Sequence, residues 1–220
     1  MAGPTSPGEP TVPPDGWTPD PPFTEREPFA RIEADNRLSR WVNEHLIDPD
    51  GELHNPDHEH LELADIGFLW TDVALERKQR KVIGAAEIPS PRGHPVTKLR
   101  ARWALEQFDV HQVDFLITLD SVWVDGAFPE QFLALLEHEL YHCGQEEDEY
   151  GFPRFRKSDG EPIYTIRGHD VEEFVGVVER YGAKASGPET QRLVEAAQGD
   201  PELARADVAH LCGTCQRAAA

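Results

Sequence analysis

The residues best suited to chemistry form one short run, His138-Glu139-Leu140-Tyr141-His142. Residues four positions apart lie on the same face of an α-helix, so both imidazoles can point at one metal ion. Glu139 is rotated about a third of a turn from His138, where it can take a proton from a water molecule. Two neutral imidazoles and one further protein ligand suit zinc and leave a position for that water. The run therefore predicts a zinc-dependent hydrolase of the peptidase type.

The residues around this run predict the helix that the chemistry requires. Phe132, Leu133, Leu136 and Leu140 follow a helical spacing over residues 129–143. A proline begins this segment and Gly144 follows it, as is typical of a helix start and end. The alternative interpretation is a pair of surface histidines on an acidic helix. The leucines count against it, because they place the helix in the interior, where two histidines and a carboxylate need partners.

The third metal ligand is expected just before a second predicted helix, over residues 170–181. His169 lies at the entry to that helix and is the preferred ligand, with Glu172 and Glu173 as alternatives. Asp170 and Glu173 can form a capping box, which gives Glu173 a local role that Glu172 lacks. Asp170 can instead orient a ligating histidine.

Three ordered blocks of the sequence carry a resemblance to a known family. They are residues 136–143 with the HExxH run, the acidic Asp148-Glu149-Tyr150-Gly151, and residues 169–174 leading to Arg180-Tyr181-Gly182. From about residue 65 to about residue 182 the chain resembles the putative phage metallopeptidase family. The resemblance implies a compact zincin-like domain, with the motif histidines as ligands and Glu139 as the base. It also implies a phage or prophage origin, but the family is named from its motif and brings no substrate. The peptide or protein substrate follows only from the predicted peptidase chemistry of the HExxH run.

The order of the predicted elements indicates an α+β fold, a minimal zincin-like domain whose small sheet packs against the HExxH helix and further helices. A helix is predicted over 28–46, a loop over 47–60, and strands over 66–70, 81–88 and 113–119. Residues 122–124 are expected to extend the last strand or form an edge piece, and 188–217 to form two short helices. The predicted domains are a disordered proline-rich tail (1–27), the metallopeptidase domain (28–185) and a helical C-terminal extension (186–220).

The composition limits which binding partners and which cellular compartment we expect for the protein. A formal net charge of −20 argues against nucleic acid, whose phosphates need clustered Lys and Arg. The sequence contains no run of eighteen apolar residues, the length that would predict a membrane span. The start of the chain does not resemble a secretory signal. Three cysteines, an odd number, are not spaced as a disulfide framework. We therefore expect a cytoplasmic protein, in the bacterial host if it is phage-encoded.

Two further clusters and one cysteine are interpreted as structural. The histidines at 54, 58 and 60, with Asp57 and Glu59, are expected to form a solvated loop and not a weak metal site. His210, Cys212 and Cys215 resemble half of a zinc or redox site, but the second pair of ligands is missing. An incidental pair or a small contribution to the core is preferred there. Cys143 is expected to be a buried thiol.

Two hypotheses of different classes follow. The first is an active zinc metallopeptidase. The second is an inactive or structural zinc-binding module, zincin-like in fold, that acts in protein–protein interaction. The presence of Glu139 favours the first, because a purely structural zinc site has no use for a base beside the metal.

Overall fold

The computed structural model describes residues 19–200, apart from 74, 78–79, 91–93, 110–111, 172–177 and 180. These residues divide into two compact units, 19–167 and 168–200. The first unit contains the sheet and the helix that carries the HExxH run. The α+β class predicted from the sequence, with a small sheet and several helices, is confirmed.

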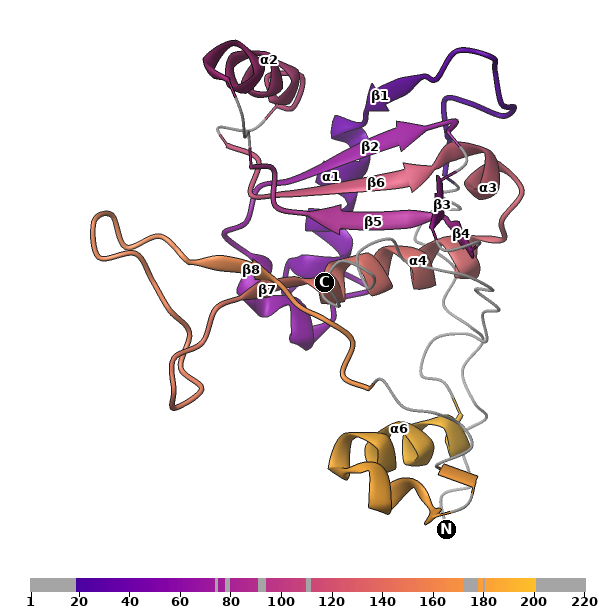
Figure 1. The fold of residues 1–220 in the computed structure, drawn as a ribbon, viewed down its shortest axis with the longest axis vertical. Coiled ribbons are helices and arrows are strands. Elements are labelled where there is room, and N and C mark those ends of the chain that lie inside the picture. Colours follow the sequence, from indigo (N-terminus) through magenta and orange to yellow (C-terminus); the bar gives the residue numbers. More distant parts are fainter. Residues whose placement is uncertain are drawn as a thin grey trace. The chain divides into compact units, whose positions relative to one another are not determined.

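A four-stranded sheet forms the centre of the first unit (Figure 1). Its order is β1 (Ile32–Ala34), β2 (Ile66–Thr71), β6 (Phe115–Asp120) and β5 (Gly84–Glu87). β2 and β6 are parallel, whereas β1 and β5 pair antiparallel at the two edges. Five of the six residues of β6 are buried, as expected for a central strand covered on both faces. The predicted strands at 66–70 and 113–119 correspond to β2 and β6.

Helix α4 (Pro129–His142) packs against the sheet beside β5 and carries the HExxH run. It buries Phe132, Leu136 and Leu140, and the Phe132 ring stacks on Trp70 of β2. The predicted helix over 129–143 is thus confirmed, but Gly144 does not cap it. Cys143 takes an extended backbone instead, and the chain continues directly into β7 (Cys143–Gln145), which pairs antiparallel with β8 (Tyr164–Ile166).

The first helix begins later than the sequence indicates. α1 spans Asn36–Val42 and continues as η2 (Asn43–Ile47), whereas the sequence predicts a helix from residue 28. Asp35 sets the start, because its carboxylate accepts hydrogen bonds from the backbone N–H groups of the next turn. The preceding residues pair with β2 as strand β1, so the side chains at 29 and 32 are exposed and do not join an apolar stripe.

The end of the proline-rich stretch lies against the sheet, although the sequence indicates a disordered tail as far as residue 27. Residues 1–18 lie outside the described part of the chain. The Phe23 side chain is only 8% exposed and belongs to the main core. Arg26 forms an ion pair with the buried carboxylate of Asp120, at 2.6 Å. Arg31 pairs in the same way with Asp72, at 2.8 Å. A buried carboxylate at a strand end needs a positively charged partner. This need explains why the segment that contains Arg26 and Arg31 lies against the sheet.

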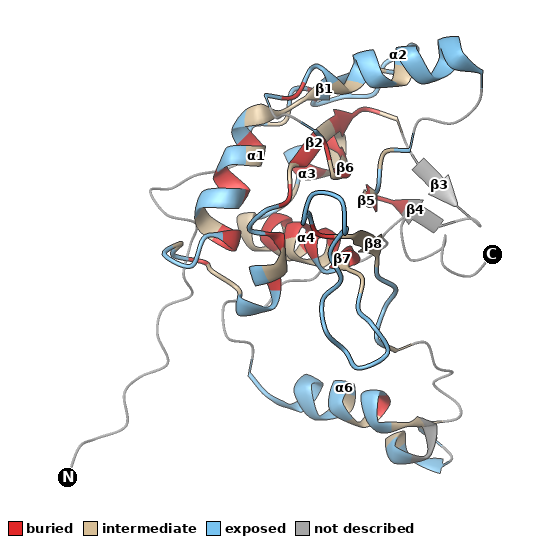
Figure 2. Cartoon of the chain, turned by 90° about the vertical axis from the view of Figure 1, so that its left-hand side faces the viewer, coloured by how far each residue is buried: buried red, intermediate tan, exposed pale blue. Residues whose placement is uncertain are grey.

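Three further elements differ from the prediction. Residues 122–124 lie in helix α3 (Ser121–Asp125) and not in a strand, because Asp120 accepts a hydrogen bond from Trp123 N and caps the helix. The predicted strand over 81–88 is divided between β4 (Arg80–Val82), which pairs with β3 (Leu75–Arg77), and β5. Helix α2 (Pro95–Leu105) is not predicted by the sequence, and none of its residues is buried (Figure 2).

The second unit contains η4 (Ala183–Ser186) and α6 (Pro188–Gln198), and α6 ends at Gly199. Most of the helix predicted over 170–181 lies outside the described residues, as does the second short helix expected after residue 201. No helix in the described part of the chain has the length and apolar character needed to cross a membrane.

Candidate metal centre

Two histidines of α4 meet on one face of the helix, as their spacing predicts. The Nε2 atoms of His138 and His142 lie 3.3 Å apart, and the ring centroids are separated by 5.0 Å. His142 is 2% exposed, whereas His138 is half-buried. Successive turns of the helix therefore bring two imidazole nitrogens together in a partly enclosed position.

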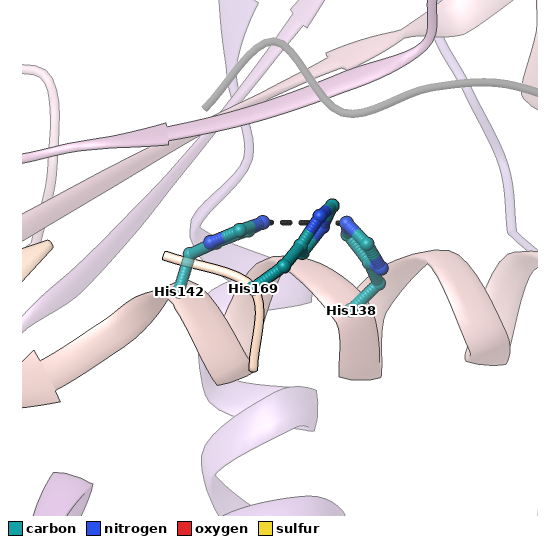
Figure 3. Close-up of side chains that lie close together, drawn as sticks. All are labelled: His138, His142 and His169. Atoms are coloured by element: carbon teal, nitrogen blue, oxygen red, sulfur yellow. Dashed lines mark hydrogen bonds between the residues drawn. The ribbon is translucent and has the colours of Figure 1, made fainter. Parts of the chain in front are cut away.

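His169 joins this pair. One ring nitrogen from each of His138, His142 and His169 can be chosen so that all three lie within 4.8 Å of one another (Figure 3). His169 itself is exposed. Glu172 and Glu173, the alternative ligands, lie outside the described residues. Within the described ranges, the three histidines are the group of metal-binding side chains that lies close enough to hold one ion.

The chain before His169 is tied to the end of α4 by two hydrogen bonds. Arg167 N donates to the carbonyl oxygen of His142 at 2.9 Å, and the Arg167 carbonyl accepts from His142 Nδ1 at 2.7 Å. The second bond fixes the tautomer, because Nδ1 must carry the proton and Nε2 keeps its lone pair. Metal-binding histidines commonly donate their other N–H to such a carbonyl.

The donor set fits a metal ion that prefers imidazole. Two nitrogens at about 2.0–2.1 Å from a tetrahedral zinc ion are roughly 3.3–3.4 Å apart, which agrees with the 3.3 Å between the Nε2 atoms of His138 and His142. Binding requires His138 to carry its proton on Nδ1, so that both Nε2 lone pairs are available. Imidazole also suits copper, iron and nickel, so the three histidines could hold an ion of any of these metals as well as zinc.

Glu139, the predicted base, is completely buried between α4 and the sheet. It lies against the backbone of Gly84 in β5: a Cβ at this position would come within 2.6 Å of Glu139 Oε1 and 2.9 Å of Leu135 Cδ1. Only glycine allows the strand to approach the carboxylate this closely. Gly84 is not among the site residues predicted from the sequence, although an isolated glycine in a strand is a sign of close backbone approach.

The histidines at 54, 58 and 60 do not form the solvated loop expected from the sequence. Residues 56–61 form the 3-10 helix η3 (Pro56–Leu61), and His58 is completely buried. His58 Nε2 lies 2.7 Å from Glu137 Oε2, and His60 Nε2 lies 2.7 Å from the carbonyl oxygen of Cys143. The expectation was wrong because the partners of this segment are about 80 residues away in the chain. The prediction for Cys143 is confirmed, since it is a buried free thiol.

The fold and the site together define an α+β protein in which three histidines, two of them from the HExxH helix, lie close enough to hold a metal ion. A family model described as putative phage metallopeptidase matches residues 39–198. The chain belongs to this family, and the match extends beyond the region of resemblance seen in the sequence. No curated protein and no solved structure matches the chain. His210, Cys212 and Cys215 lie outside both the family match and the described residues.

Membership in this family supports a peptidase that uses a metal ion and acts on peptides or proteins. The three histidines supply a group able to hold that ion.

Proposed function

We propose that the protein is a zinc-dependent metallopeptidase, with His138, His142 and His169 as the metal ligands and Glu139 as the general base. The observation that carries the proposal is the three-histidine group, with ring nitrogens within 4.8 Å of one another. An HExxH run that occurs by chance has no reason to meet a third histidine from a distant segment. The family assignment supports the same class of activity.

When bound, a zinc ion would lower the pKa of a coordinated water towards about 7 and polarise the scissile carbonyl. The residues of the chain supply the rest. His142 is fixed in one tautomer by the Arg167 carbonyl, so its Nε2 lone pair is available without rearrangement. Glu139 follows His138 directly and is enclosed between α4 and β5. It accepts a proton from the attacking water and delivers it to the leaving amine.

Metal analysis and cleavage of a peptide library test this proposal. Purified protein is expected to contain about one zinc per chain, as a single tetrahedral site requires. A chelator should abolish cleavage, and zinc should restore it. A wild-type protein that holds zinc but cleaves no member of the library would contradict the peptidase proposal. In that case the structural zinc module becomes the better hypothesis.

The third ligand is tested separately, because two alternatives lie in the same part of the sequence. His169→Ala is expected to weaken zinc binding by a factor of about ten to a hundred or more, since one of three protein ligands is lost. Glu172→Ala and Glu173→Ala are the matched comparisons and should retain zinc. If one of them loses zinc and His169→Ala does not, the assignment of His169 is wrong.

A further inference from the structure

The face of α4 adjacent to the metal ligands is held by a segment from elsewhere in the chain, residues 55–60. Glu137 and Tyr141 lie one turn apart on this face, and each directly precedes a proposed ligand in the sequence. Each is hydrogen-bonded to the 55–60 segment, as His60 is to the carbonyl of Cys143 directly after His142. Along the last turns of the helix, each contact with the 55–60 segment is thus made by a residue next to a proposed ligand in the sequence.

Glu137 receives two hydrogen bonds at one oxygen. His58 Nε2 lies 2.7 Å from Glu137 Oε2, and Asn55 Nδ2 lies 3.0 Å from the same atom. His58 must carry its proton on Nε2, because the carboxylate only accepts. His58 lies in the first turn of η3 and Asn55 is its N-cap. The start of η3 is therefore hydrogen-bonded to α4 at Glu137, the residue before His138.

Tyr141 provides the second point of contact. Its hydroxyl donates to Asp57 Oδ2 at 2.9 Å and accepts from Asn55 Nδ2 at 3.1 Å. Its ring meets the His58 ring edge to face, with centroids 4.8 Å apart. Asn55 links both contacts, because the same amide reaches Glu137 and Tyr141.

We propose that the 55–60 segment is a positioning element that fixes the rotation of α4, and thereby aims His138 and His142 at the metal ion. This inference rests on the proposed function. An imidazole nitrogen lies on the order of 6 Å from the helix axis, so a rotation of about 10° would move it by about 1 Å. Metal–ligand distances tolerate only about 0.2 Å. Contacts that restrict rotation next to the ligands therefore affect affinity directly.

A role in stability alone accounts less well for this arrangement. His58 is completely buried, and its Nδ1 has no hydrogen-bond partner among the described residues. An unsatisfied polar atom in the interior lowers the net gain from burying the ring, and an apolar side chain would avoid that cost. What the imidazole adds is a directed bond to Glu137, at the helical position next to a ligand.

The test compares four variants of the full-length protein. Glu137→Ala removes the acceptor of both donors, and Glu137→Gln restores an acceptor oxygen. Tyr141→Phe removes the hydroxyl and keeps the ring. His54→Ala is the matched control, because His54 Nδ1 lies 3.2 Å from the Ile47 carbonyl oxygen, outside α4. Zinc affinity is measured by chelator competition. Two further readouts are the visible absorption of the cobalt-substituted protein and the imidazole ¹H–¹⁵N spectrum of the metal-free protein.

We expect Glu137→Ala to raise the zinc dissociation constant about 10- to 100-fold, the usual effect of groups that orient metal ligands. The cobalt spectrum and the His138 and His142 ring signals should change as well, with Glu137→Gln close to wild type and His54→Ala unchanged. Unchanged ring signals in folded Glu137→Ala would overturn the positioning role, even if its melting temperature falls. Absence of zinc binding in the wild type would instead overturn the proposed function, and the metal-free spectra would still decide the positioning role.

Discussion

Replacing Gly84 by alanine would place a methyl group against the carboxylate of Glu139. The added Cβ would lie 2.6 Å from Glu139 Oε1, whereas an ordinary contact begins near 3.4 Å. The carboxylate must therefore move by about 0.8 Å, the difference between these two distances. A misplacement of about 1 Å can reduce a catalytic rate about 100-fold. Gly84→Ala is thus expected to lower kcat by about two orders of magnitude.

The proposed metal ligands should be less affected, because the nearest atoms to the new methyl group belong to Glu139 and Leu135 and not to a histidine. The assay is steady-state cleavage of a peptide selected from a library, with zinc content and melting temperature measured on the same preparation. Overpacking should also destabilise the fold by about 1–3 kcal/mol. Gly126→Ala is the control, because its Cβ would meet nothing closer than 3.8 Å and its backbone suits alanine.

Two outcomes would refute this prediction. A folded Gly84→Ala protein with wild-type kcat would show that the carboxylate does not depend on this glycine. A loss of zinc in parallel with the fall in kcat would show that the substitution disturbs the whole site and not the base alone.

Three predictions concern the unit that supports the site. Phe23→Ala should lower the free energy of unfolding by about 3 kcal/mol, because the ring is buried in the main core; an unchanged urea midpoint would show that residues 23–31 do not hold the sheet. The backbone N–H of Arg31 lowers the pKa of Asp72 below 3.8, so this group stabilises the fold above that pH, and its contribution is lost as the pH falls through the lower folded pKa. Asp72→Asn should therefore flatten the acid limb of a stability–pH curve measured by urea unfolding between pH 2 and 5, and an identical curve would contradict this. Burial raises the pKa of the Asp114 carboxyl. Ionisation of this group therefore lowers the free energy of unfolding as the pH rises towards neutral. Asp114→Asn should add a few tenths of a kcal/mol at pH 7, given its partial exposure to solvent, and a loss of stability at pH 7 would show that its hydrogen bonds outweigh its burial.

The parts of the fold that the sequence predicted are those with a local signal. The HExxH helix combines apolar spacing with a proline at its first position, and both operate within a few residues. β2 and β6 are short apolar runs that a buried parallel pair requires. Of the proposed ligands, His138 and His142 follow from helical spacing alone. The position of His169 at the start of a predicted helix favours it as the third ligand, and its ring lies near the other two in the structure.

The parts that were missed depend on distant partners or on side chains without a regular pattern. Val122, Trp123 and Val124 favour a strand by residue type, but the Asp120 cap begins a helix there. No helix is predicted over the residues of α2. Because none of them is buried, packing does not require an apolar stripe on this helix. The residues around His58 in the sequence do not predict its hydrogen bond to Glu137. In the same way, the residues around Gly84 do not predict its close approach to Glu139. These contacts depend on how the elements pack, which residue spacing does not encode.

The central claim is tested most directly by comparing the wild type with Glu139→Gln at equal zinc content in one peptide-cleavage assay. The amide retains the size of the side chain but cannot act as a base, so the substitution leaves the three histidines in place. We predict full zinc binding and a kcat that falls by about 100-fold or more, on the order expected for a general base. Equal cleavage by the two proteins, with zinc bound in both, would contradict the assignment of this site as a peptidase centre with Glu139 as its base.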